Sequence, residues 1–123
     1  MAAGTVTITE ETYGTIKKIK FDWTSGDGAE DGTASGQTTH AYSGKILGLA
    51  TDPGSPAPTA LYDITVTDED GMDVLMGGGV DRSATVTEYV LSSSLGAVAN
   101  DKLTINVSAA GTNTKGVAYL YIR

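Results

Sequence analysis

Three carboxylates in one short segment have the spacing of a calcium-binding loop. Residues 68–73 read DEDGMD, and Asp68, Asp70 and Asp73 stand around a glycine turn that could direct their oxygens to one Ca²⁺ ion. The motif is incomplete, because Gly79 occupies the twelfth position, where an EF-hand loop has its acidic ligand, and the flanks read as strands. The alternative is a solvated turn that uses Asp and Gly for their backbone geometry. The sequence favours the turn.

Catalysis by a nucleophile would have to involve His40, the single histidine of the chain. Ser35 and Ser43 lie near it in the sequence, but neither sits in a nucleophile elbow or beside an oxyanion-hole motif. Cysteine is absent, which excludes thiol catalysis, disulfide bonds and cysteine-ligated metal. Gly26 and Gly28 lack the further glycine and the following helix of a phosphate-binding loop. We therefore predict that the protein is not an enzyme and has no cofactor.

Three other groups of residues are candidates for contact with a partner protein. The only basic cluster, at residues 17–20, marks either the solvent face of a strand or a contact with an acidic protein surface. Residues 25–36 form a long acidic loop, whose carboxylates are either simply solvated or part of a functional surface. All three prolines lie in residues 51–58, a rigid extended connector. The contact candidates are Lys17, Lys18, Lys20, Asp27, Asp31, Pro53, Pro56 and Pro58.

The best-defined element in the sequence is a β-hairpin over residues 61–76, LYDITVTDEDGMDVLM. Tyr62, Ile64 and Val66 alternate with polar residues, the DEDG turn reverses the chain, and residues 72–76 alternate again. Alternation of this kind places successive side chains on opposite faces of a strand. We expect the hairpin to be a scaffold that holds the contact loops.

Alternation of apolar and polar residues predicts further strands on both sides of this hairpin. Residues 15–24 place Ile19, Phe21 and Trp23 on one face, which predicts a half-buried strand near the middle of the core. Residues 37–50 fit one long bent strand or two short strands joined at a bulge. Residues 92–100 are ambiguous between a helical turn and a loop, and their serines favour the loop. The expected strands cover residues 5–9, 15–24, 37–50, 62–67, 72–76, 84–91, 103–107 and 116–122.

About eight strands joined by Gly, Pro, Asn and Asp turns, with no convincing helix, predict an all-β fold. The 123 residues are enough for one core, so we expect a single domain, residues 1–123, shaped as a jelly-roll-like sandwich of two antiparallel sheets. An immunoglobulin-like sandwich is the alternative. Both faces of residues 117–122 are apolar, so this strand lies either deep in the fold or against a partner in an oligomer.

The charge of the chain limits its partners. The formal net charge is -7 and the isoelectric point about 4.4, which disfavours nucleic acid and anionic membranes as partners. The first four residues lack the basic and apolar regions of a secretion signal, and no segment approaches the roughly 20 apolar residues of a membrane helix. We expect the protein to stay in a cytoplasm until it joins an assembly.

Five segments that cover about half of the chain form a recognisable succession of strands and turns: Gly4 to Ile8, Tyr13 to Trp23, Tyr62 to Gly71, Gly96 to Ser108 and Gly116 to Arg123. Together these segments resemble the small β-rich head decoration, or cement, proteins of tailed bacteriophages. The resemblance is a succession of strands and turns without a chemical signature, and it extends to neck, collar and tail proteins of virions. The short N-terminal segment differs from the long arm by which some decoration proteins attach.

The resemblance implies a non-enzymatic structural protein that binds the outer surface of an assembled capsid and stabilises contacts between subunits of the major capsid protein. It also implies a homo-oligomer, a dimer or trimer, which is assembled in the host cytoplasm and located on the virion. An alternative is a carbohydrate-binding β-sandwich displayed on the virion, for which Tyr42, Tyr62 and Tyr89 are the aromatic candidates. A small hydrolase is a further alternative, which the lack of a coherent catalytic motif opposes.

Overall fold

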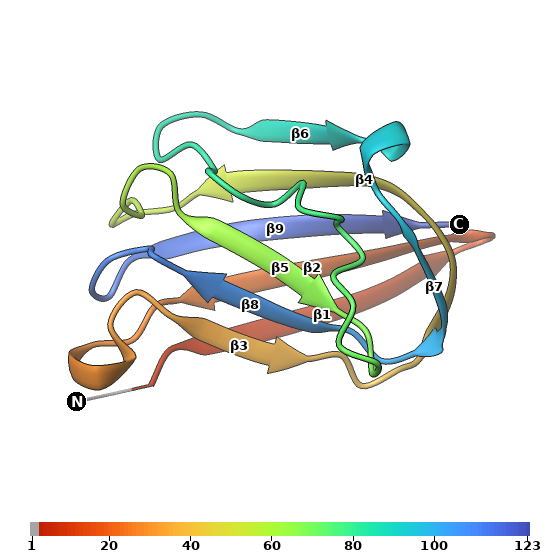
Figure 1. The fold of residues 1–123 in the computed structure, drawn as a ribbon, viewed down its shortest axis with the longest axis horizontal. Coiled ribbons are helices and arrows are strands. Elements are labelled where there is room, and N and C mark those ends of the chain that lie inside the picture. Colours follow the sequence, from red (N-terminus) through yellow and green to blue (C-terminus); the bar gives the residue numbers. More distant parts are fainter. Residues whose placement is uncertain (1–2) are drawn as a thin grey trace.

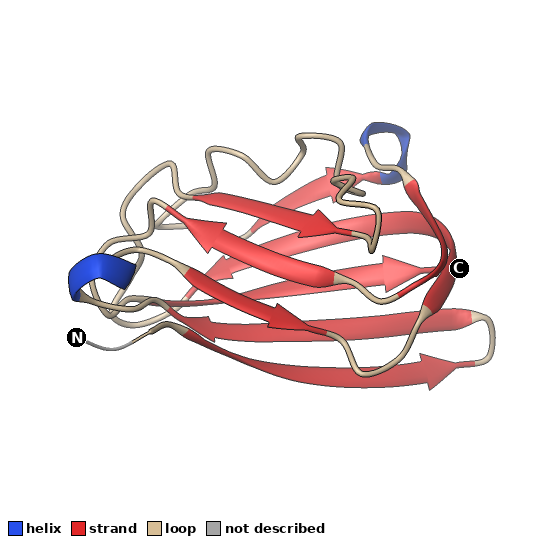
Figure 2. Cartoon of the chain, turned by 60° about the horizontal axis from the view of Figure 1, so that its bottom comes forward, coloured by secondary structure: helices blue, strands red, loops and turns tan. Residues whose placement is uncertain are grey.

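The computed structural model describes residues 3–123 as two β-sheets packed face to face (Figure 1, Figure 2). The described residues form nine strands and two short 3-10 helices, so the prediction of an all-β fold with two sheets is confirmed. The strands are β1 (Thr5–Tyr13), β2 (Ile16–Thr24), β3 (Ala34–Gln37), β4 (Tyr42–Pro53), β5 (Asp63–Thr67), β6 (Glu88–Leu91), β7 (Ala97–Asp101), β8 (Thr104–Ser108) and β9 (Lys115–Ile122), and the helices are η1 (Gly28–Glu30) and η2 (Ser92–Ser94).

The chain crosses between the two sheets several times. The large sheet has the order β1-β2-β9-β4-β6, with β7 paired to the first part of β4, and the small sheet has the order β3-β8-β5. The pairings between these strands are antiparallel. From β2 to β5 each strand lies in the opposite sheet from the one before it, and β9 returns to the large sheet between β2 and β4 (Figure 1). The jelly-roll form of this connectivity remains a prediction.

The core lies between the two sheets and is built from alternate residues of each strand. Ile19, Phe21 and Trp23 of β2 are fully buried, as their alternation predicted. They form one cluster with the buried residues of the small sheet, and the Trp23 ring lies 5.4 Å from the Tyr62 ring. Gly116 of β9 makes this packing possible, because a Cβ at that position would lie only 2.4 Å from Cζ2 of Trp23.

Strand β4 is one long strand with two bulges, which is the first of the two forms expected for this segment. Its pairing shifts between Tyr42 and Ser43 and again between Ile46 and Gly48. The first part of the strand pairs with β7 and the second part with β6 and β9, so that β4 bends around one end of the sandwich (Figure 1). Bulges permit such a bend because they locally interrupt the ladder and increase its twist.

The hairpin predicted over residues 61–76 is wrong in its second half. β5 and the turn after it form, but residues 72–76 make a single bridge to β5 and then leave it in successive turns. The cause is the carboxylate of Asp73, which accepts three backbone hydrogen bonds within this region and so competes with the strand ladder. Its donors are the N–H groups of Val66, Leu75 and Gly77. The long-range partner of β5 is β8.

The strand predicted over residues 84–91 is half as long in the structure. β6 begins only at Glu88, and the residues before it are bends. The Ser83 hydroxyl accepts the N–H groups of Thr85 and Val86, at 3.1 Å each, and holds the chain in a turn there. Val86, which lies in this turn, is exposed.

Two segments predicted as loops contain strands. Residues 92–100 hold η2 and then most of β7, where the buried side chain of Val98 packs into the core. The loop predicted over residues 25–36 ends early, because Ala34 is buried and begins β3. In both cases a few apolar residues, Leu95 and Val98 in one segment and Ala34 in the other, are buried through long-range packing that a local pattern does not reveal.

Candidate functional site

Three loops far apart in the sequence meet at the end of the sandwich where β1 begins (Figure 1). They are residues 25–33, 53–59 and 109–115, and we call this surface the loop end. The first connects β2 to β3, the second follows β4, and the third connects β8 to β9. The strand order places them side by side, because β9 lies between β2 and β4.

Hydrogen bonds join the three loops into one unit, with residues 109–115 in the middle. The backbone N–H of Ser25 donates to Thr114 O at 2.8 Å, and the N–H of Lys115 donates to Pro56 O at 2.9 Å. The buried Ser25 hydroxyl also donates to a carbonyl of this middle loop, at 2.6 Å. Loops held in this way are preorganised, so little conformational entropy is lost when a partner binds them.

Five of the eight contact candidates from the sequence lie at the loop end. They are Asp27, Asp31, Pro53, Pro56 and Pro58. Pro58 is buried within the loop end and does not lie on its surface. Asp31 is exposed, and its carboxylate accepts a hydrogen bond from the Thr112 hydroxyl, which ties the first loop to the third. The fold thus brings the predicted acidic loop and the predicted proline connector together.

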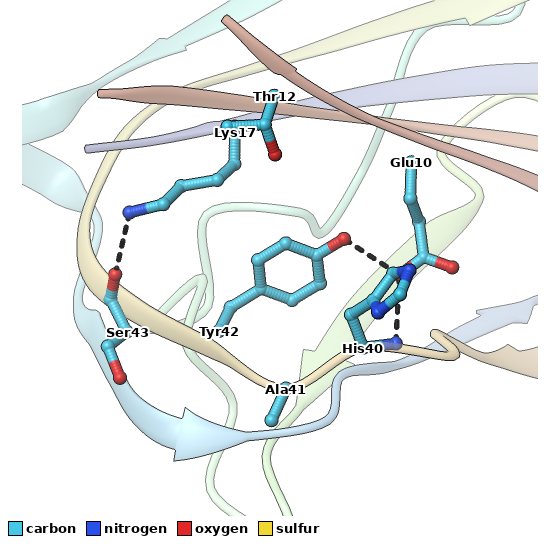
Figure 3. Close-up of a pocket in the computed structure, with 7 residues that line it drawn as sticks. All are labelled: Glu10, Thr12, Lys17, His40, Ala41, Tyr42 and Ser43. Atoms are coloured by element: carbon cyan, nitrogen blue, oxygen red, sulfur yellow. Dashed lines mark hydrogen bonds between the residues drawn. The ribbon is translucent and has the colours of Figure 1, made fainter. Parts of the chain in front are cut away.

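The lysine cluster does not join them. Lys18 and Lys20 project from β2 onto the outward side of the large sheet, because they alternate with the buried residues of that strand. Lys17 belongs to the other side of β2, near the β1–β2 turn, and its Nζ donates to Ser43 O at 3.1 Å (Figure 3). The cluster in the sequence is therefore divided between two surfaces.

The outward side of the large sheet, which we call the outer face, carries apolar and aromatic side chains. Tyr89 and Leu91 of β6 are 75% and 72% exposed. Tyr119 and Tyr121 of β9 are half-buried, and Lys18 Nζ lies 5.5 Å from the centre of the Tyr119 ring. Part of this face is a shallow groove of about 240 Å³ between β4, β6 and β9. Exposed patches of this composition are typical of interaction surfaces.

The outward side of the small sheet has the opposite character, because each of its outward residues in β3, β5 and β8 is polar. They are Ser35, Gln37, Asp63, Thr65, Thr67, Thr104, Asn106 and Ser108. Neighbouring strands are joined on this side by polar contacts, such as the hydrogen bond from the Ser35 hydroxyl to Asn106 Oδ1 at 3.2 Å. A polar side needs no cover, so the outer face is the sheet surface better suited to a partner protein.

The three tyrosines expected to form an aromatic platform do not share a surface. Tyr62 is fully buried and Tyr42 nearly so, because both occupy inward positions, and only Tyr89 is exposed. The aromatic side chains that do share one face are Tyr13, Tyr89, Tyr119 and Tyr121. The sequence signal that could have located Tyr119 and Tyr121 is the apolar character of both faces of β9.

A pocket of about 420 Å³ lies between the β1–β2 hairpin and the start of β4 (Figure 3). Its lining includes His40, Glu10, Lys17 and Tyr42. The Glu10 carboxylate accepts three hydrogen bonds across the pocket wall. Its donors are Thr39 N at 3.0 Å, His40 N at 3.1 Å and the Tyr42 hydroxyl at 2.7 Å.

These contacts set the charge state of the pocket. Partial burial by itself raises the pKa of the Glu10 carboxyl, but the three hydrogen bonds and the nearby His40 outweigh it, and the pKa is lowered. Burial, and then the hydrogen bond to Glu10, raises the pKa of the Tyr42 hydroxyl. The Ser43 hydroxyl accepts the N–H of Asn100 at 2.8 Å. The Glu10 carboxylate is therefore ionised and accepts three hydrogen bonds, which suits a structural link between β1 and the start of β4 better than the role of a general base. We call this link the clasp.

The fold rearranges the calcium-loop candidates. Asp68 and Asp70 lie beside Asp101 of β7, and one carboxylate oxygen from each lies within 4.8 Å of the others. Asp73 is turned away into the backbone contacts described above. Partial burial, followed by the charges of the neighbouring acidic residues, raises the pKa of Asp101. Any cation held here would therefore be bound with Asp101 in place of Asp73.

A comparison with protein-family models gives no match, and neither does a comparison with curated proteins. Within residues 3–123 no helix is long and apolar enough to cross a membrane. The surfaces of the molecule are thus the main guide to its function.

Proposed function

We propose that the protein is a non-enzymatic structural protein of a tailed-bacteriophage virion, which binds the outside of the assembled capsid and stabilises contacts between major capsid protein subunits. The resemblance in the sequence supports this proposal. The loop end supports it as well, because it is a stiff surface on which Asp31 and Pro56 stand exposed. In this function the protein acts as a homo-oligomer on the virion surface, joins the particle in the host cytoplasm and needs no cofactor.

Binding to the assembled shell is sufficient to stabilise it. A protein that binds the assembled state and not the separate subunits shifts the equilibrium toward assembly by mass action. A shell offers many equivalent sites, so a modest contact at each site adds up over the particle. A preorganised loop end suits this role, because its loops are already ordered when they bind the formed shell and little conformational entropy is lost.

Two alternatives use the same surfaces. A neck, collar or tail protein would present the loop end to a different virion protein. A carbohydrate-binding module would instead use the outer face, and the observation that favours it is the position of Tyr89, Tyr119 and Tyr121 on one side of the large sheet. Glycan-array binding that is lost in Tyr121→Ala, with no binding to heads, would support this alternative over the capsid function.

The capsid function is tested by mixing the purified protein with heads assembled without it and imaging them by cryo-electron microscopy. We expect density at regular lattice positions outside the shell, with the loop end toward the capsid. Asp31→Lys should reduce occupancy, because it reverses a charge on the proposed contact surface. Ser35→Lys, on the polar side of the small sheet, is the matched control and should bind normally. Absent or irregular density with the unaltered protein would refute the function.

A further inference from the structure

The area of the outer face, its aromatic composition and the arrangement of its opposite charges suit it for contact with a second copy of the chain. From these features we infer that two copies pack their outer faces together around a two-fold axis, with Lys20 of each copy opposite Asp22 of the other. The two-fold axis lies in the plane of the interface and is perpendicular to the strands. It passes between the positions of Lys20 and Asp22 on β2. The contact is independent of capsid binding, which the loop end provides.

The area of the outer face is sufficient for a dimer. The face is about 24 Å wide, from five strands at roughly 4.8 Å spacing, and about 26 Å long, from the eight residues of β9 at roughly 3.3 Å each. Because β6 has only four residues, two such faces would bury about 1,100 Å² in total, which exceeds the roughly 1,000 Å² expected of a biological interface. The tyrosines and the exposed apolar residues of β6 give the face the aromatic composition of such interfaces.

The register of the sheet places the outward residues in rows that run across the strands. In one row Asp22 neighbours Val117, which neighbours Asp52, and in the next row Lys20 neighbours Tyr119, which neighbours Ala50. The proposed axis places the first row of one copy over the second row of the other. Each Lys20 then meets an Asp22, and each Val117 meets a Tyr119.

The rows on either side also match without a clash of like charges. One of them contains Glu11, Lys18 and Tyr121, and the corresponding row at the far side contains Thr5, Thr24 and Lys115. The same axis places these two rows over each other, so Lys18 meets Thr24 and Tyr121 meets Lys115, a favourable cation–π arrangement. A two-fold interface requires this kind of self-complementarity, because the same patch contributes both sides.

The mixed charge also argues against other occupants. A partner of uniformly negative charge would oppose Lys18 and Lys20 well but would repel Asp22 and Glu11 on the same face. A sugar ring stacked on Tyr119 would compete with the Lys18 ammonium, which already lies over that ring. A second copy supplies both signs in the required order.

The arrangement has a consequence for the position of the loop ends. An axis across the strands reverses the strand direction of the second copy, so the two loop ends point away from each other. One dimer would therefore carry a binding surface at each end, and it would bridge two neighbouring subunits when it lies lengthwise on the shell with each loop end against one subunit.

The test is a charge exchange measured by analytical ultracentrifugation over a range of concentrations. Lys20→Asp should place acidic residues opposite Asp22, and Asp22→Lys should place basic residues opposite Lys20, so each variant alone should dimerise at least about tenfold more weakly. The double variant Lys20→Asp/Asp22→Lys should recover the dimer. An equimolar mixture of the two single variants should form a heterodimer, because each copy then meets the opposite charge.

Recovery in the double variant and in the mixture would exclude a simple folding defect, and the melting temperature of each single variant serves as a second check. A protein that stays monomeric at all concentrations, forms trimers, or dimerises equally in all variants would overturn the inference. Heads are absent from this experiment, so failure of the dimer and failure of capsid binding are separate results.

Discussion

Several carboxylates in this acidic protein act as acceptors for backbone N–H groups. Glu10 holds the segment before β4, and Asp73 holds the chain after the β5 turn, each through several hydrogen bonds. Asp68 accepts the N–H groups of Asp70 and Met72 in the turn itself. Charge-assisted hydrogen bonds of this type are stronger than neutral ones. Asp68 and Asp73, which the sequence suggests as calcium ligands, thus fix the conformation of the backbone around the turn.

Glu10→Gln tests this role through the pH dependence of stability. The folded-state pKa of Glu10 is lowered, so its contribution is present above the ordinary glutamate pKa of about 4.3 and is lost as the pH falls through the lower folded value. The variant should lower the free energy of unfolding by about 1–2 kcal/mol at pH 7. This difference should shrink as the pH falls below about 4.3, as measured by urea unfolding at each pH.

The control for this experiment is Glu11→Gln on the same strand. Glu11 is exposed on the outer face and accepts one hydrogen bond, from the Tyr13 hydroxyl at 2.6 Å. An exposed contact of this kind contributes little, so the stability should change by less than about 0.5 kcal/mol. Equal effects of the two substitutions, or an effect of Glu10→Gln that is constant with pH, would contradict the clasp.

At the scale of elements, the strands predicted well are those that pack one regular face against the core. β2 and β8 follow their alternation from end to end, because long-range pairing and local pattern agree. The second arm of the hairpin and the first half of the 84–91 strand alternate equally well but do not form. There the side chains of Asp73 and Ser83 satisfy backbone N–H groups that a ladder would otherwise use.

The candidate surfaces were predictable only in part. The sequence identified the acidic loop and the proline connector, yet their meeting depends on β9 lying between β2 and β4, which no local pattern contains. The tyrosines of β9 were indicated by the apolar character of both its faces. Asp101 had no motif to mark it, because the long-range pairing of β5 with β8, which places Thr67 opposite Thr104, is what brings it beside Asp68 and Asp70.

Asp73→Ala tests the account of the chain after β5. The substitution removes the acceptor of three backbone N–H groups, so we expect a loss of about 1–3 kcal/mol in the free energy of unfolding and faster hydrogen exchange at Leu75 and Gly77. Asp70→Ala is the control, because it removes a carboxylate near Asp101 and should leave stability unchanged or slightly raised. A hairpin held by β-pairing alone would tolerate both changes equally.

At the scale of the molecule, three regions of the described surface differ in their chemistry. The loop end is stiff and acidic, the outer face is aromatic with mixed charge, and the outward side of the small sheet is polar. The proposed functions assign the first region to the capsid and the second to another copy of the chain. The third stays in solvent, which is why Ser35→Lys serves as a neutral reference for capsid binding.

The most direct test of the central claim is the thermal stability of heads assembled without the protein, measured with increasing amounts of it added. The disruption temperature should rise with concentration above the dissociation constant and keep rising logarithmically after the lattice sites are full, because a protein that binds only the assembled shell stabilises it by mass action. Asp31→Lys should need a higher concentration for the same rise. Regular binding without any rise in temperature, or no binding at all, would contradict a role in stabilising the capsid.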